Sequence, residues 1–119
     1  MHHSVTFYET ESGNCPVEKF IRALPDKTAS KIATTIEFIE DTKCPPHHIL
    51  QKMPGTADLW EVRVKHDGNI YRLLGFFDGE QLIMLTSAFQ KKTQKTPRQE
   101  IQTAEARKAD YFRRKDPKP

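Results

Sequence analysis

The sequence predicts an α+β fold, in which a small, mainly antiparallel sheet carries two helices on its core face and a further helix at the C-terminus. Strand-like runs at about 59–66, 69–77 and 81–89 are joined by two Asp-Gly pairs. Asp-Gly between such runs is a strong hairpin signal. Apolar residues at helical spacing occur in the half of the chain before these strands and again after the last strand, and they predict helices there. With 119 residues, the chain is the size of one domain, and we expect a single domain over 1–119.

The N-terminal half is expected to form one strand and two helices. Residues 4–9 alternate apolar and polar side chains, which is typical of a strand. A short helix begins at Pro16, because proline is well tolerated at the first helical position. A second helix is expected over about 26–42, before Cys44-Pro45-Pro46 stops it. The apolar stripe of the first helix consists of Val17, Phe20, Ile21 and Leu24.

A loop over 47–58 then leads into the three strand-like runs. After them, Thr96-Pro97-Arg98-Gln99 fits a capping box, with threonine as N-cap and proline at the first position. It predicts a helix from 97 to about 114. The expected order of elements is therefore β-α-α-β-β-β-α.

Basic side chains gather on one face of the predicted sheet. A two-residue turn at Asp67-Gly68 places Arg63 opposite Arg72, and a turn slipped by one residue places Lys65 there instead. Side chains alternate along strands and opposed residues point the same way, so all three cations share a face in either register. Counting through the second hairpin adds the following residues to that face: Leu85, Ser87, Phe89 and Lys91.

The other face of the sheet is expected to form the core. Its members are Trp60, Val62, Val64, Tyr71, Leu73, Met84 and Thr86. The cationic face also has an apolar half toward Asp78, which the C-terminal helix is available to cover, leaving the cationic end as a shallow basic cleft. The apolar half consists of Leu74, Phe76, Ile83 and Leu85.

Like charges directly opposed on a sheet are destabilising, and arginine cannot lose its proton to relieve this. The cluster therefore indicates an anionic partner. In the alternative interpretation, Glu61 on the same face neutralises the group and leaves an ordinary solvated surface. The charge distribution favours a polyanion or an acidic protein, because residues 88–119 carry ten Lys/Arg against four Asp/Glu.

Other features of the sequence narrow the possible functions. Cys15 and Cys44 lack metal or redox spacing, and no apolar run is long enough to span a bilayer. We expect free thiols, no membrane association and a cytoplasmic location. No Gly-rich phosphate loop, metal-ligand cluster or nucleophile motif is present in the sequence.

A basic cleft can still cleave RNA, since the 2′-hydroxyl of RNA supplies the nucleophile and charge stabilisation drives much of phosphoryl transfer. In this interpretation, Arg72 and Lys91 stabilise the charge on the phosphate. Lys65 is the first candidate base and Glu61 the second. A lysine can act as base only if neighbouring cations lower its pKa. Phe89 is a candidate for stacking on a base, whereas Tyr71 points to the core.

The block from Leu59 to Arg114 resembles the RelE/HigB toxins of type II toxin–antitoxin systems (the RelE/ParE superfamily), including their phage-derived relatives. The resemblance lies in an L-W-E-V-R strand, the Tyr71-Arg72 pair, and the F-Q-K-K-T-Q-K-T-P junction between the last strand and the helix. It implies a RelE-like fold and a toxin that cleaves mRNA in the ribosomal A site without a metal or other cofactor. It also implies a cognate antitoxin, often of helix-turn-helix type.

The resemblance also implies roles for individual residues. Arg72 matches the phosphate-binding arginine, Lys91 or Lys92 the basic position that ends the last strand, and Arg63 and Lys65 a strand that supplies basic residues. Several branches of the superfamily place a tyrosine or histidine near the cleft, and here no histidine follows. The candidate catalytic residues are therefore Arg72, Lys91, Lys65 and Arg63. The candidate RNA-binding residues are Lys52, Phe89, Lys92, Lys95 and Arg98.

Two other functions stay open at this point. A ParE-like toxin shares the superfamily and inhibits DNA gyrase without cleaving RNA. A non-catalytic, phage-derived nucleic-acid-binding protein also fits the basic face. The retained cationic cluster favours the ribonuclease, and the missing acid–base pair keeps the other two in consideration.

Overall fold

The computed structural model describes residues 2–91 and 96–115 of the chain. Five strands form one mixed sheet in the order β1-β5-β4-β3-β2, in which only the β1–β5 pair is parallel. The helices are α1 (Pro16–Arg22), α2 (Asp26–Asp41) and α3 (Arg98–Lys115). The strands are β1 (Ser4–Phe7), β2 (Leu50–Lys52), β3 (Trp60–His66), β4 (Asn69–Asp78) and β5 (Leu82–Gln90).

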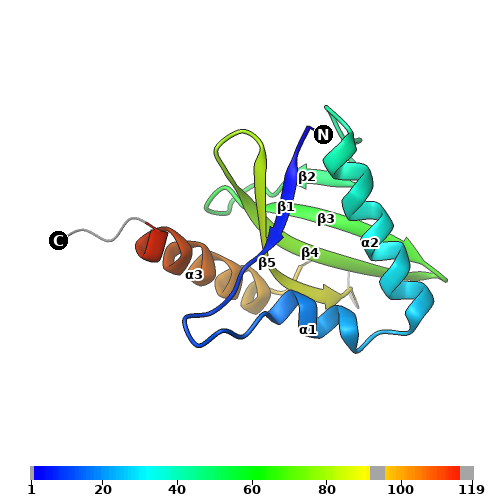
Figure 1. Cartoon of the computed structure of the whole chain (residues 1–119), viewed down its shortest axis with the longest axis horizontal. Coiled ribbons are helices and arrows are strands. Elements are labelled where there is room, and N and C mark those ends of the chain that lie inside the picture. Colours follow the sequence, from blue (N-terminus) through cyan, green and yellow to red (C-terminus); the bar gives the residue numbers. More distant parts are fainter. Residues whose placement is uncertain (1, 92–95, 116–119) are drawn as a thin grey trace.

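The sheet lies between two layers of helix, and the predicted α+β class is confirmed (Figure 1). One face packs against α1 and α2 in the larger hydrophobic core. Burying these apolar side chains supplies the main driving force for the arrangement. The fully buried members of this core include Val17 of α1, Ile32 and Ile39 of α2, and Val62, Val64 and Leu73 of the sheet.

The short strand β2 was not predicted. Leu50–Lys52 lies within the expected loop and pairs with Trp60–Val62 at the edge of the sheet. Three residues are too few to show strand periodicity, and the pairing depends on the neighbouring edge of β3. The observed order is therefore β-α-α-β-β-β-β-α.

The first hairpin has the predicted two-residue turn. Asp67 and Gly68 both have positive φ, at 50° and 78°, as a type I′ turn requires. Arg63 therefore pairs with Arg72. The second Asp-Gly pair behaves differently, because Asp78 belongs to β4 and three residues separate it from Leu82.

A β-bulge interrupts the pairing of β4 with β5. Leu74 pairs with Ser87 but Gly75 pairs with Leu85, so Thr86 is an extra residue in β5. An extra residue reverses the alternation of side chains beyond it. Gly75 permits this crossing, because a Cβ built there would lie 2.2 Å from the backbone oxygen of Met84.

The bulge corrects three of the predicted side-chain positions. We expected Ile83 and Leu85 on the cationic face and Met84 in the core, and all three assignments were wrong. Ile83 and Leu85 belong to the core under α1 and α2, whereas Met84 packs with Phe76 on the side of α3. Simple alternation gives the face of a side chain only where no residue is inserted in the strand.

The C-terminal helix covers the apolar half of the other face, as predicted. Leu74 packs with Ala104 near the start of α3, and Phe76 packs with Tyr111 and Phe112 near its end. None of the described helices combines the length and apolar character needed to cross a bilayer.

Side chains at the end of α3 also bind the sheet, and we call this group the clasp. The Tyr111 hydroxyl donates to Asp78 at 2.6 Å, and Lys115 forms an ion pair with the same carboxylate. Asp110 accepts from the hydroxyl of Tyr8 and pairs with Arg114 at 2.9 Å. Asp78 thus joins α3 to β4, and Asp110 joins α3 to Tyr8, which directly follows β1.

Candidate nucleic-acid interface

The end of the sheet near the start of α3 brings together the predicted cationic residues. We expected this end to be an open cleft, but Arg72 and Phe89 are almost fully buried there. Arg63 of β3 lies opposite Arg72 of β4, which lies opposite Phe89 of β5. Strand alternation places Glu61 on this face as well. The backbone N–H of Lys91 donates to the carbonyl of Ile70 at 2.7 Å, so this lysine continues the ladder just beyond β5. We call Arg63, Arg72, Lys91 and Glu61 the cationic cluster.

Arg72 forms a buried ion pair inside this cluster. Its Nη1 lies 3.1 Å from Oε2 of Glu61, and the two side chains are 9 % and 2 % exposed. The other carboxylate oxygen of Glu61 accepts from Nε2 of Gln51 at 3.0 Å. Both oxygens of Glu61 are therefore engaged, which disfavours its use as a general base.

The guanidinium group of Arg72 is only partly hydrogen-bonded within the described residues. Nη1 also donates to Oγ1 of Thr96 at 2.6 Å, just before α3 begins. Its Nε is buried and has no hydrogen-bond partner among the described residues. Buried donors are rarely left unpaired, and an unmade hydrogen bond at a charged group is costly.

Glu61 balances only part of the positive charge. Arg63, Arg72 and Lys91 share its face, and among the described residues these three cations form one ion pair, between Arg72 and Glu61. The pKa of Lys91 is lowered by partial burial and then by the charges of Arg72 and Arg63, while Glu61 opposes the shift. A lowered pKa favours proton acceptance by a lysine. The sequence had favoured Lys65 as the candidate base, and Lys91 is a second candidate.

The other candidate residues are distributed unevenly. Lys65 shares the face of Arg63 and is exposed, and Arg98 is exposed at the first turn of α3. Lys52 pairs with Asp58 at 3.1 Å, and its register opposite Trp60 places it on the other face. Lys92 and Lys95 lie outside the described residues.

Phe89 offers little surface on which a base could stack. Its side chain belongs to a small hydrophobic cluster with Leu59, Leu74 and Ala104, and the residue is only 9 % exposed. It lies on the predicted face, directly opposite Arg72. Its position shows that the start of α3 extends close to the cationic cluster.

Two members of the site could not be recognised in advance. Gln51 lies in the strand that was expected to be loop, and Thr96 was interpreted only as a helix cap. In the structure α3 begins at Arg98, and the Thr96 hydroxyl accepts a hydrogen bond from Arg72. Glu61, in contrast, was considered in advance as the residue that neutralises the cations, because it lies two residues from Arg63 in the strand and therefore on the same face.

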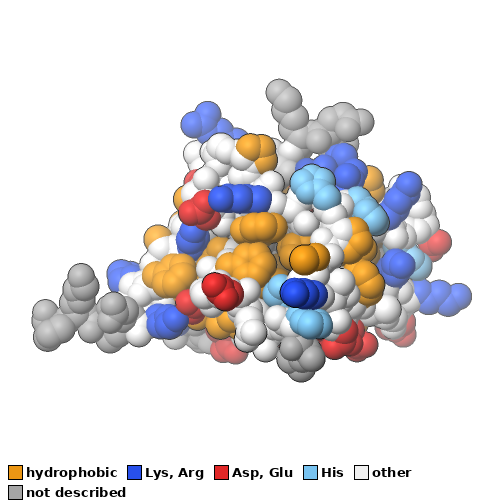
Figure 2. Space-filling view, turned by 90° about the horizontal axis from the view of Figure 1, so that it is seen from above, with side chains coloured by type: hydrophobic (Ala, Val, Ile, Leu, Met, Phe, Trp, Pro, Cys, Tyr) orange, Lys and Arg blue, Asp and Glu red, His pale blue; other side chains and the backbone are white. Residues whose placement is uncertain are grey.

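Figure 2 shows one face of the molecule, where hydrophobic side chains gather centrally and basic, acidic and histidine side chains lie around them. On this face charge of both signs is mixed, in contrast to the cationic cluster. Within residues 2–91 and 96–115, no group of three or more His, Cys, Asp or Glu side chains is arranged to hold a metal ion. Three cations that share a face with a single carboxylate suit the binding of an anion, and one of these cations, Lys91, has a lowered pKa.

Comparison with known proteins identifies the family of this chain. The family model for phage-derived Gp49-like proteins (DUF891) matches residues 19–109, which include α2, strands β2 to β5 and most of α3. None of the curated proteins compared with the chain matches it. Gp49-like proteins are a phage-derived, toxin-like family associated with toxin–antitoxin systems. The matched region contains the whole cationic cluster, and the chain belongs to the Gp49-like family.

Proposed function

We propose that this chain is the toxin of a type II toxin–antitoxin system and acts as a ribosome-dependent mRNA endoribonuclease of RelE/HigB type. The observation that carries the proposal is the composition of the cationic cluster. Three cations share a face with one carboxylate, and the buried Nε of Arg72 has no partner among the described residues. Such a site favours a phosphate group over a neutral ligand.

The proposed reaction uses the RNA as its own nucleophile. The 2′-oxygen attacks the adjacent phosphorus, the bond from phosphorus to the 5′-oxygen breaks, and a 2′,3′-cyclic phosphate results. Arg72 and Arg63 stabilise the charge that develops on the phosphate oxygens. Lys91 is the candidate to accept the proton of the 2′-hydroxyl, because its pKa is lowered. The leaving 5′-oxygen takes up a proton from solvent or from the protonated lysine.

The partners follow from the same proposal. The ribosome positions the mRNA strand in line for attack, because the protein cluster by itself supplies charge but little that would orient the sugar. A cognate antitoxin, of helix-turn-helix type by the resemblance, neutralises the toxin. We propose a cytoplasmic location, where ribosomes and mRNA are found.

Induced expression followed by mapping of mRNA 5′ ends tests the proposal. The informative variants are Arg63→Met and Lys91→Met, because both residues are at least partly exposed and neither holds the recorded ion pair with Glu61. Arg72→Ala alone is less clear, since it leaves Glu61 buried without its partner. Lys43→Met, an exposed lysine after α2, removes one charge away from the cluster and is the matched control.

We expect growth arrest with codon-positioned cleavage for the wild type and the Lys43→Met control. The cluster variants are expected to lose about 100-fold or more of the cleavage rate, the range seen when one charge-stabilising donor is removed. Arrest with intact mRNA and inhibited DNA supercoiling would instead identify a gyrase inhibitor. Absence of arrest and cleavage would favour a non-catalytic nucleic-acid-binding protein.

A further inference from the structure

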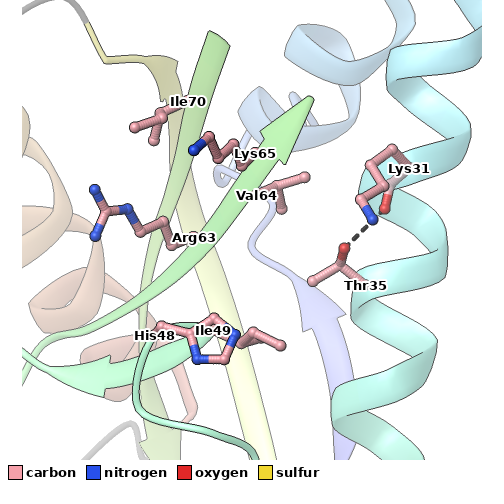
Figure 3. Close-up of a pocket in the computed structure, with 8 residues that line it drawn as sticks. All are labelled: Lys31, Thr35, His48, Ile49, Arg63, Val64, Lys65 and Ile70. Carbon is pink, nitrogen blue, oxygen red and sulfur yellow. Dashed lines mark hydrogen bonds between the residues drawn. The ribbon is translucent and has the colours of Figure 1, made fainter. Parts of the chain in front are cut away.

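A hollow of about 450 Å³ lies beside β3, on the side of the sheet edge toward α2 (Figure 3). Arg63 and Lys65 extend from β3 on the side away from α2, Lys31 lies on α2 on the other side of this strand edge, and His48 lies just before β2. Among the described residues, no acidic side chain lines the hollow. Its walls thus carry three basic side chains and one imidazole, which come from three separate parts of the chain.

The hollow exists because the first residue of β2, Leu50, pairs with Val62, so the last residues of β3 extend past β2. Among the described residues, the last backbone hydrogen bond at that edge runs from the N–H of Arg63 to the carbonyl of Ile49, at 2.9 Å. β3 continues to His66, and β2 provides no partner there. Because successive residues of a strand direct their backbone groups to opposite sides, Lys65 turns its N–H and carbonyl toward this free edge.

Arg63 connects the hollow with the cationic cluster. It lines the hollow, lies opposite Arg72, and its charge contributes to the lowered pKa of Lys91. Positive charge therefore continues from the cluster, around the free edge of β3, to Lys31 on α2. A nucleic-acid strand carries one phosphate per nucleotide and can contact several cations of this surface at once, which a single phosphate cannot.

We infer that the hollow binds the backbone phosphates of a single-stranded RNA whose neighbouring phosphate lies at the cationic cluster. This deepens the proposed function, on which the identity of the substrate rests, and adds Lys31 and His48 to the RNA-binding residues. Lys31 and Lys65 bind successive phosphates, and the imidazole of His48 donates a hydrogen bond to the backbone.

An acidic peptide is the competing ligand, since it could add a strand to the free edge. The edge offers only the N–H and carbonyl of Lys65 between the last β2 contact and the turn. Two backbone hydrogen bonds are too few to hold an added strand, whereas phosphate contacts need only the side-chain cations. The apolar side chains of Ile49 and Ile70, which also line the hollow, provide a surface for a base.

The test measures binding of a fluorescently labelled, 2′-O-methylated 12-mer of uridine, which cannot be cleaved by 2′-hydroxyl attack. The variant is Lys31→Ala/His48→Ala, and Lys43→Ala is the control that removes an exposed lysine outside the hollow. Anisotropy titrations at several salt concentrations give the affinity and the number of phosphates bound. We expect about three- to tenfold weaker binding and a salt slope smaller by about 0.7 for each phosphate that the variant no longer neutralises.

A second arm uses a trimer of the same chemistry, which binds fewer phosphates at once. We expect the double variant to lose less affinity for the trimer than for the 12-mer. Binding of the 12-mer unchanged from the Lys43→Ala control would overturn the inference. A loss confined to a 12-residue poly-glutamate peptide would do so as well and would identify the peptide as the ligand.

These outcomes are independent of the cleavage assay. If the double variant weakens 12-mer binding while the wild type cleaves no mRNA on ribosomes, the inference holds and the proposed function fails. If the wild type cleaves and the double variant binds the 12-mer normally, only the inference fails. Lys31 and His48 are exposed, so the variants should keep their fold, which a thermal melt checks.

Discussion

The two ends of the sheet face under α3 use charge in opposite ways. At the clasp, Asp78 pairs with Lys115 and Asp110 pairs with Arg114, so the cations are matched by carboxylates beside an aromatic cluster. At the cationic cluster, one carboxylate faces three cations and α3 does not cover them all. The same face therefore has one end built to hold a helix and one end that retains positive charge for a ligand.

The boundary between the two ends is the β-bulge. Beyond it, Met84 replaces Leu85 on the α3 side and completes the apolar surface around Phe76. Nη1 of Arg107 on α3 donates to the backbone oxygen of Thr86 at 2.8 Å and to Oγ of Ser87 at 3.1 Å. The helix is thus fixed at the point where the face changes from polar to apolar.

The largest effect is expected for Glu61→Ala, which removes the carboxylate from the buried ion pair. Arg72 would keep its charge in a site where it is almost fully buried, at a cost of about 3–5 kcal/mol in the free energy of unfolding. Urea denaturation measures this loss. The double variant Glu61→Leu/Arg72→Met is the control, because replacing both partners should recover most of it. If Glu61→Ala lowers the free energy of unfolding by less than about 1 kcal/mol, the charge of Arg72 does not stay buried when its partner is removed.

Gly75→Ala tests the boundary and is expected to have the next largest effect. The new methyl group would meet the backbone oxygen of Met84, so β4 and β5 must separate or shift register. Forced overpacking of this kind costs about 1–3 kcal/mol. Thermal unfolding measures this loss, and Gly13→Ala is a comparison in which the new methyl group adds backbone strain, at a φ of 93°, but no clash. A destabilisation of Gly75→Ala well below about 1 kcal/mol would contradict a steric role for Gly75.

At the clasp, acid is expected to loosen α3. The pKa of Asp78 is lowered by its bonds to Lys115 and Tyr111, and that of Asp110 chiefly by the hydroxyl of Tyr8. A carboxyl whose folded pKa lies below its unfolded value stabilises the fold above about pH 4, and the contribution is lost as the pH falls through the folded pKa. Urea midpoints of wild type and Asp78→Asn should differ at about pH 6 and converge toward about pH 2.5. A gap that is constant over this range would exclude the ion pair as its cause.

The smallest effect concerns Lys91. Because the charge of Arg63 contributes to lowering the pKa of this lysine, Arg63→Met should raise that pKa. The side-chain carbon next to the Lys91 amine reports its titration by NMR. Lys65→Met is the comparison, since Lys65 is not among the groups that shift Lys91. No change in Arg63→Met would place the arginine too far from Lys91 for a shared phosphate.

Much of this architecture could be predicted from local patterns. The helices over 16–41 follow from apolar spacing and proline positions, and the first hairpin follows from Asp67-Gly68, whose conformation needs positive φ. That turn sets the register that opposes Arg63 and Arg72. The composition of the cationic cluster was therefore readable in the sequence, because strand parity carries through a tight turn.

Tertiary structure decided the rest. The bulge at Thr86 depends on contacts with Gly75 and with Arg107 on α3, and no local pattern marks an inserted residue. Likewise, β2 forms only against β3, and it brings Gln51 to Glu61. Sequence alone determined that cations would share a face. Only packing determined that Arg72 is buried against Glu61 and that Lys91 has the lowered pKa, because burial and charge separation arise from elements distant in the chain.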